Sequence, residues 1–217
     1  LVTAVIPVAS PVSILDANAG GVYGWWGMDF FWSPDSLSLA YAQPDGIGII
    51  DLESKAKQGL IEIPPLQTRQ DWAWVPSVSW SPDATILYTV SHVAADSSLS
   101  TEESPRFDLI AVPVFGGAPV TLAEEVGMFA YPVASPVMST TLGAANETPF
   151  QIAYLQASQP LQSETSRYQL TIIDRDGSNK RIVFPQTGAQ GLEPQQVVWS
   201  PEPVDEVGNH AIAFTYQ

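Results

Sequence analysis

Residues 30–42 read FFWSPDSLSLAYA, and residues 78–90 read VSWSPDATILYTV. A third copy of the shared phrase, Trp-Ser-Pro-Glu, begins at Trp199, and a degraded copy, Ala-Ser-Pro, begins at Ala134. The copies recur at intervals of about 50–65 residues, and repetition at such a period is typical of solenoids and propellers. The phrase therefore predicts a repeat architecture.

The sequence after each copy predicts β-strands. The second copy, for example, is followed by TILYTVSHV, FDLIAVPVF and APVTLAE. Short runs rich in β-branched and aromatic residues, bounded by Gly, Pro, Asp or Ser, are strand signals, and no segment shows a sustained helical period. Each repeat thus predicts four antiparallel strands, the first of which ends in the phrase. The expected fold class is all-β, a β-propeller of four-stranded antiparallel blades with about four blades' worth of chain.

The phrase itself has a mechanical interpretation. Proline after a strand ends ladder pairing because it has no N–H to donate. Aspartate at the next turn position accepts hydrogen bonds from nearby backbone. The tryptophan is expected to pack between neighbouring blades, although a ligand-stacking role is the alternative. The residues assigned to the structural repeat are Trp32, Pro34, Asp35, Trp80, Pro82, Asp83, Trp199 and Pro201.

These repeats resemble those of TolB-type β-propellers. The resemblance rests on the Trp-Ser-Pro-Asp copies and on LTIIDRDGSNKRIVF, which begins at Leu170. It extends over nearly the whole chain at the level of repeats, and it is specific for fold but not for function. Two positions depart from the family pattern, since Ser36 and Ala84 stand where glycine is usual. The resemblance implies protein or peptide partners and an extracytoplasmic location, periplasmic, secreted or surface-anchored.

The strand pattern predicts a single domain over residues 1–217. The blades are expected at about 21–66, 67–125 and 126–191, with a composite blade formed by 1–20 and 192–217. Such a composite blade closes many propellers. A closed ring of four blades and an arc of a larger ring both fit this pattern. An arc would need its remaining blades or another subunit to cover its apolar end faces.

Composition excludes several partners. The 217 residues carry a net charge of −15, which argues against binding nucleic acid or an anionic membrane surface. No cysteine is present, so thiol catalysis and thiolate metal sites are excluded. No stretch of about twenty apolar residues exists for direct membrane insertion.

Catalytic and metal motifs are lacking. No Gly-x-Ser-x-Gly elbow or Gly-rich phosphate loop occurs. Residues 174–179, DRDGSN, are better interpreted as a hairpin turn than as a calcium loop, because Lys180 stands where a closing acid is needed. His92, placed after a strand, and His210 do not form a zinc pair. No catalytic residue, metal or cofactor is therefore expected.

Aromatic residues recur just before the first strand of each blade. Such connections line one mouth of a propeller channel, where aromatic side chains either bind a ligand or plug the channel. The candidate binding residues at this mouth are Tyr23, Trp25, Trp26, Arg69, Asp71, Trp72, Trp74, Phe129 and Tyr131.

Three functions remain open at this stage. The leading hypothesis is a non-catalytic propeller that binds protein or peptide through the aromatic loops. The second is the substrate-gating propeller of a prolyl-oligopeptidase-like serine peptidase, with the catalytic domain outside this sequence. The third is a propeller that binds a small ligand or a sugar.

Overall fold

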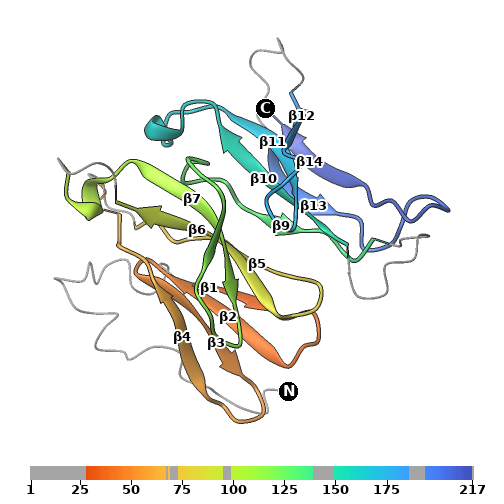
Figure 1. Cartoon of the computed structure of the whole chain (residues 1–217), viewed down its shortest axis with the longest axis horizontal. Coiled ribbons are helices and arrows are strands. Elements are labelled where there is room, and N and C mark those ends of the chain that lie inside the picture. The colour runs from red at the N-terminus through yellow and green to blue at the C-terminus, as the bar shows by residue number, and fades with distance from the viewer. Residues whose placement is uncertain are drawn as a thin grey trace.

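The computed structural model describes residues 28–66, 68, 73–94, 99–138, 149–185 and 194–216. These residues form four antiparallel sheets, shown in chain order from red to blue in Figure 1. The first sheet contains β1 (Asp29–Trp32), β2 (Ser38–Gln43), β3 (Gly46–Asp51) and β4 (Lys57–Glu62). The second contains β5 (Val78–Trp80), β6 (Ile86–Val93), β7 (Arg106–Pro113) and β8 (Val120–Ala123). The third contains β9 (Val133–Ala134), β10 (Gln151–Ala157), β11 (Tyr168–Asp174) and β12 (Arg181–Phe184).

The last sheet pairs β13 (Pro194–Trp199) with β14 (Ile212–Tyr216). In each complete sheet the strands pair in chain order, so each is a meander. The predicted all-β propeller fold is confirmed. The other half of the expected composite blade, residues 1–20, lies outside the described residues, and the proposed blade boundaries stay a prediction.

Helical structure is limited to two short 3-10 turns among the described residues. They are η2 (Thr101–Glu103), between β6 and β7, and η3 (Pro160–Gln162), between β10 and β11. No described helix is long and apolar enough to cross a membrane.

A serine hydroxyl holds the turn between the first and second strands of every sheet. Ser33 Oγ accepts from the backbone N–H of Ser38, and Ser81 Oγ accepts from that of Ile86, both at 2.9 Å. In the degraded copy Ser135 Oγ accepts from Gln151 N at 3.0 Å, and in the last sheet Ser200 Oγ accepts from Ala211 N at 2.9 Å. The serine is thus common to all four turns.

Aspartate adds a second set of bonds in the two complete copies. Asp35 accepts from Ser33 Oγ at 2.6 Å and from Leu37 N at 2.9 Å. Asp83 accepts from Ser81 Oγ at 2.6 Å and from Thr85 N at 3.2 Å. At Asp83 burial opposes ionisation, but the hydrogen bonds from Ser81 and Thr85 outweigh it and lower the pKa of the carboxyl. The expected role of the aspartate in bonding nearby backbone is confirmed.

Tryptophan joins neighbouring sheets in two places. Trp80 Nε1 donates to the carbonyl of Phe31 in the first sheet at 2.9 Å. Trp199 Nε1 donates to the carbonyl of Val133 in the third sheet at 3.0 Å. Phe31 and Val133 hold the same place in their own sheets, one residue before the tryptophan position, so the two junctions are equivalent.

The junction between the second and third sheets lacks its tryptophan, because Ala134 occupies that position. Here the backbone N–H of Ala134 donates to Ser79 Oγ at 3.0 Å. Ser79 is the residue before Trp80, so a hydroxyl acceptor takes the place of the carbonyl. The two sheets are therefore joined at the same position, but by a backbone N–H and a hydroxyl instead of an indole and a carbonyl.

Trp32 differs from the other two tryptophans. Its side chain is 65% exposed, and no described strand covers it. The expectation that the tryptophans pack between blades holds for Trp80 and Trp199, and for Trp32 it stays a prediction. Residues 1–20, which belong to the composite blade expected beside Trp32, lie outside the described residues.

We expect Trp80→Phe to lower the free energy of unfolding by about 1–2 kcal/mol, because it removes the bond to Phe31 and part of a packed indole. Tyr88→Phe is a matched control. The Tyr88 hydroxyl is buried and has no hydrogen-bond partner among the described residues. Its removal should leave stability unchanged or raised. Urea denaturation measures both variants, and an equal loss in the two would contradict the role given to Trp80.

The turn residues Ser36 and Ala84 lie in the left-handed region, with φ of 61° and 58°. An L side chain is strained there, whereas glycine is not. We expect Ala84→Gly to stabilise the protein by about 0.5–1 kcal/mol. Ala56→Gly, in an exposed turn residue that is not among those with positive φ, should be destabilising instead. Thermal unfolding of the two variants tests the sign of each effect.

Candidate functional site

The connections on one side of the sheets build the candidate site. The segment 124–132, which connects β8 to β9, lies beside the start of β7 and the end of β10. Val126 N donates to Phe107 O at 2.8 Å, and Leu155 N donates to Ala130 O at 2.6 Å. The β10–β11 connection, residues 158–167, borders the same segment through Tyr168, whose hydroxyl accepts from Phe129 N at 3.3 Å and donates to Ser163 O at 2.9 Å.

A pocket of about 630 Å³ opens between the third sheet and β13 on this side. Its lining combines aromatic, aliphatic, amide, hydroxyl and carboxylate side chains. The lining residues are Phe129, Tyr131, Val133, Leu155, Glu164, Ser166, Tyr168, Pro194, Gln195, Gln196 and Val197. This size is within the range of about 300–1,000 Å³ that is usual for ligand sites.

Three aromatic rings form one wall of this pocket. Phe129 and Tyr131 stack with their centroids 6.0 Å apart and their planes at 25°. Phe129 and Tyr168 also lie 6.0 Å apart, tilted at 56°. Tyr131 is 46% exposed, so its ring is open to a ligand. Burial, and then the negative charge of Asp29 in β1, raise the pKa of the Tyr131 hydroxyl.

The backbone holds two pocket residues in an unusual conformation. Tyr131 has a φ of 41° and Gln196 a φ of 51°, both in the left-handed region. Non-glycine residues persist there only when the surrounding structure holds them, and such residues cluster at binding sites. The hydrogen bond from Phe129 N to the Tyr168 hydroxyl supplies part of that support.

A second pocket of about 450 Å³ lies next to the first. Its lining residues are Leu66, Thr68, Glu103, Ser104, Pro105, Phe107, Met128, Leu161, Gln162, Ser163, Glu164 and Thr165. Glu164 lines both pockets, so the 158–167 connection stands between them. Together the two pockets form one surface of the second and third sheets, divided by the 158–167 connection. It lies on the side that carries the 124–132 and 158–167 connections, hereafter the loop side.

The structure places the sequence-predicted binding residues in different environments. Phe129 and Tyr131 lie together in the first pocket. Trp74 does not reach either pocket, because it is buried, donates from Nε1 to Met128 O at 3.0 Å and packs on Phe107. Trp74 is therefore a core residue in this structure. The remaining candidates, Tyr23, Trp25, Trp26, Arg69, Asp71 and Trp72, lie outside the described residues.

Tyr168, Glu164, Gln195 and Gln196 are pocket residues that the sequence analysis did not select. No sequence motif marks these residues. Glu164 lies in the β10–β11 connection, Tyr168 begins β11, and Gln195 and Gln196 lie in β13 of the next sheet. Only the expectation that these two kinds of connection share one side of a propeller would have grouped them.

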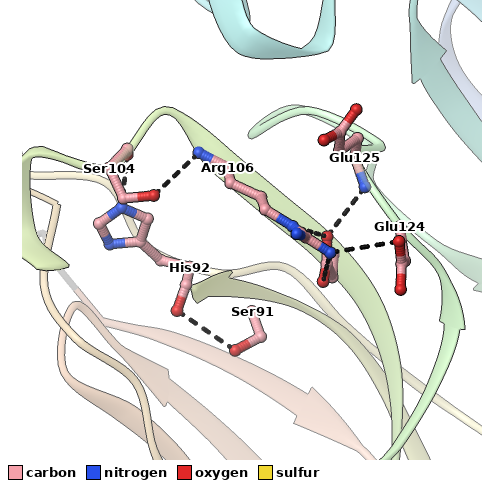
Figure 2. Close-up of polar contacts among 7 residues, drawn as sticks. Ser91, His92, Ser104, Arg106, Glu124 and Glu125 are labelled. Carbon is pink, nitrogen blue, oxygen red and sulfur yellow. Dashed lines mark hydrogen bonds and ion pairs between the residues drawn. The ribbon is translucent and has the colours of Figure 1, made fainter. Parts of the chain in front are cut away.

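The polar cluster at the start of β7 is structural. Figure 2 shows Arg106 beside the neighbouring Glu124, with an Nη2–Oε2 distance of 3.3 Å. Arg106 also donates twice to buried Asp108 at 3.2 Å, and Asp108 accepts from Glu125 N at 2.8 Å. These bonds fasten the 124–132 segment to β7.

His92 lies inside β6 and is fully buried, so its predicted place after a strand is wrong. Its Nδ1 lies 2.8 Å from Pro64 O and its Nε2 2.7 Å from Ser104 O (the second contact lies beside Arg106 in Figure 2). The ring also stacks on Phe107 at 4.9 Å. His92 thus ties two connections to the second sheet. Among the described residues, no group of three His, Asp or Glu side chains is placed to hold a metal ion.

The chain has the fold of a β-propeller, and the loop-side pockets are its candidate binding site. No model of a known protein family matches the sequence, and no curated protein matches it. Solved structures do match. An oligogalacturonate lyase from Vibrio parahaemolyticus has a TM-score of 0.52 at 15% identity, covering 88% of this chain and 46% of that chain.

Two further matches have lower TM-scores. TolB from Acinetobacter baumannii gives 0.38 at 12% identity, over 86% of this chain and 51% of that chain. A protein described as putative TolB from Agrobacterium tumefaciens gives 0.34 at 14% identity, over 88% and 82%. This chain therefore spans about half the length of the lyase and of the first TolB. At such identities the likeness concerns the fold alone.

Tyr168→Phe tests how the aromatic wall is held. The change removes the hydroxyl that bridges Phe129 N and Ser163 O, and we expect it to cost about 1–2 kcal/mol of stability. Hydrogen exchange should become faster in 126–131 and 160–166, while exchange in β6 and β7 stays unchanged. Equal acceleration throughout the chain, or none, would contradict a local bridging role.

Proposed function

We propose that this chain is a non-catalytic binding propeller that takes a protein or peptide segment on its loop side. The carrying observation is the pair of adjoining pockets, of about 630 and 450 Å³, on either side of the 158–167 connection. An extended peptide presents successive side chains at a short, regular spacing, and neighbouring pockets suit such a ligand.

The chemistry of the lining supports the choice of ligand. Phe129 and Tyr131 offer rigid aromatic area, which gives large contact at low cost in conformational entropy. Glu164 borders both pockets and Glu103 borders the second. With a net charge of −15 on the whole chain, a segment that carries Lys or Arg beside an apolar side chain is favoured. Such a role suits an extracytoplasmic protein that meets other proteins, and the location is part of the proposal.

A sugar is the second candidate, favoured by one specific arrangement. The exposed ring of Tyr131 and the amides of Gln195 and Gln196 line the same pocket. A flat ring together with amide groups also suits a pyranose, which offers an apolar face and an edge of hydroxyls. Among the described residues of the lining, Glu164 is the single carboxylate, whereas glycoside hydrolysis commonly uses two.

Selection of a randomised peptide library on the immobilised chain tests the proposal. We expect selected peptides to carry a basic residue next to an aromatic or aliphatic one. Tyr131→Ala should weaken their binding at least about tenfold, and Glu164→Gln should weaken it by a smaller factor that shrinks as salt is raised. Calorimetry with one selected peptide measures both factors.

The control is Phe115→Ala. Phe115 is 86% exposed but lies in the β7–β8 hairpin beside the Ser-Pro-Asp turn, since Val114 N donates to Thr85 O. Its removal should leave peptide binding unchanged. Peptides whose binding ignores both Tyr131 and Glu164, or failure to select any peptide, would refute the proposal. Binding of a neutral oligosaccharide that is lost in Tyr131→Ala would favour the second candidate instead.

A further inference from the structure

Trp32 is exposed, although it occupies the position at which Trp80 and Trp199 join neighbouring sheets. Within the chain, each sheet has a tryptophan face, which carries the side chain at the tryptophan position of its first strand. The opposite face carries the residue before it. In the second sheet the tryptophan face presents Val78 and Trp80, both buried against the first sheet.

On the same face of the first sheet, the side chains of β1 are exposed. Phe30 and Trp32 correspond to Val78 and Trp80, and alternate residues of a strand share a face. Both are exposed, as is Leu37 in the turn that follows. Val78 and Trp80, which correspond to Phe30 and Trp32 in the second sheet, are buried.

The last sheet shows the complementary surface. Val198 in β13 corresponds to Phe31 and Val133, the two residues whose carbonyls accept from an indole. Its side chain is 54% exposed. On the same face of β14, Ala213 and Thr215 are also exposed, whereas Phe214 on the other face packs against Phe184 of the third sheet.

We propose that the Trp32 edge docks on the Val198 face of a second copy of this chain, with Trp32 Nε1 donating to the carbonyl of Val198. The two internal junctions show what covers a tryptophan face: the strand that presents this carbonyl position. Among the described strands only β13 presents that position uncovered, and it is not joined to Trp32 within one copy, because both residues are exposed.

Head-to-tail association satisfies both surfaces at once. Two copies related by a two-fold axis form two identical Trp32–Val198 junctions and leave neither surface open. Each copy contributes four sheets, so a ring of two copies stays within the range of about 4–8 blades usual for propellers. The contact residues are uncharged, and salt at about 0.15 M screens the repulsion between two acidic copies beyond roughly 8 Å.

Sedimentation velocity of the full chain at several concentrations tests the proposal. We expect the wild type to associate, and Trp32→Ala and Val198→Asp each to weaken association at least about tenfold. An equimolar mixture of the two variants should regain part of it, because the intact Trp32 of one meets the intact Val198 of the other. Phe115→Ala, which removes an exposed aromatic elsewhere, should associate like the wild type.

Circular dichroism checks that each variant is folded, and Leu37→Asp replaces Trp32→Ala if that variant is not. A wild type that stays monomeric at every concentration would overturn the proposal and would favour closure of the ring within one copy. A mixture that associates no better than its separate components would also overturn it, since a symmetric contact of like surfaces gives that result.

Discussion

A four-stranded blade has two faces, and a small twisted sheet is stable only when an apolar face is covered. In this chain the covering partner is the next blade along, and the contact is made at the inner strand by an indole that donates to a backbone carbonyl. The bond from Trp80 to Phe31 and that from Trp199 to Val133 are two instances of the same geometry. The order of the sheets and the position of the loop-side pockets depend on it.

The junction is defined by position more than by residue type. Where Ala134 replaces tryptophan, the acceptor residue is a serine, and the bond runs from backbone to hydroxyl. The blades have therefore diverged by exchanging which partner supplies the side chain. The first pocket opens beside the third sheet and β13. Because the blades have diverged in sequence, such openings are lined by different residues at different junctions.

Much of the fold could be predicted from the sequence, because a repeated phrase followed by short β-branched runs specifies strand, turn and strand without reference to distant contacts. The site was predicted less well. Phe129 and Tyr131, selected from their place before a first strand, line the pocket, whereas Trp74, selected by the same rule, lies in the core. Glu164 and Tyr168 were missed, since they reach the pocket only through the packing of one connection on another.

The serine that closes each first turn has a consequence for how this protein can change. Its hydroxyl bonds a backbone N–H five residues ahead at Ser33 and Ser81, eleven ahead at Ser200 and sixteen ahead at Ser135. The two strands are thus clamped at their base whatever length of chain lies beyond. The connection after Ser200 is therefore a natural place for a grafted epitope or tag, because the serine bond holds the two strands at its base.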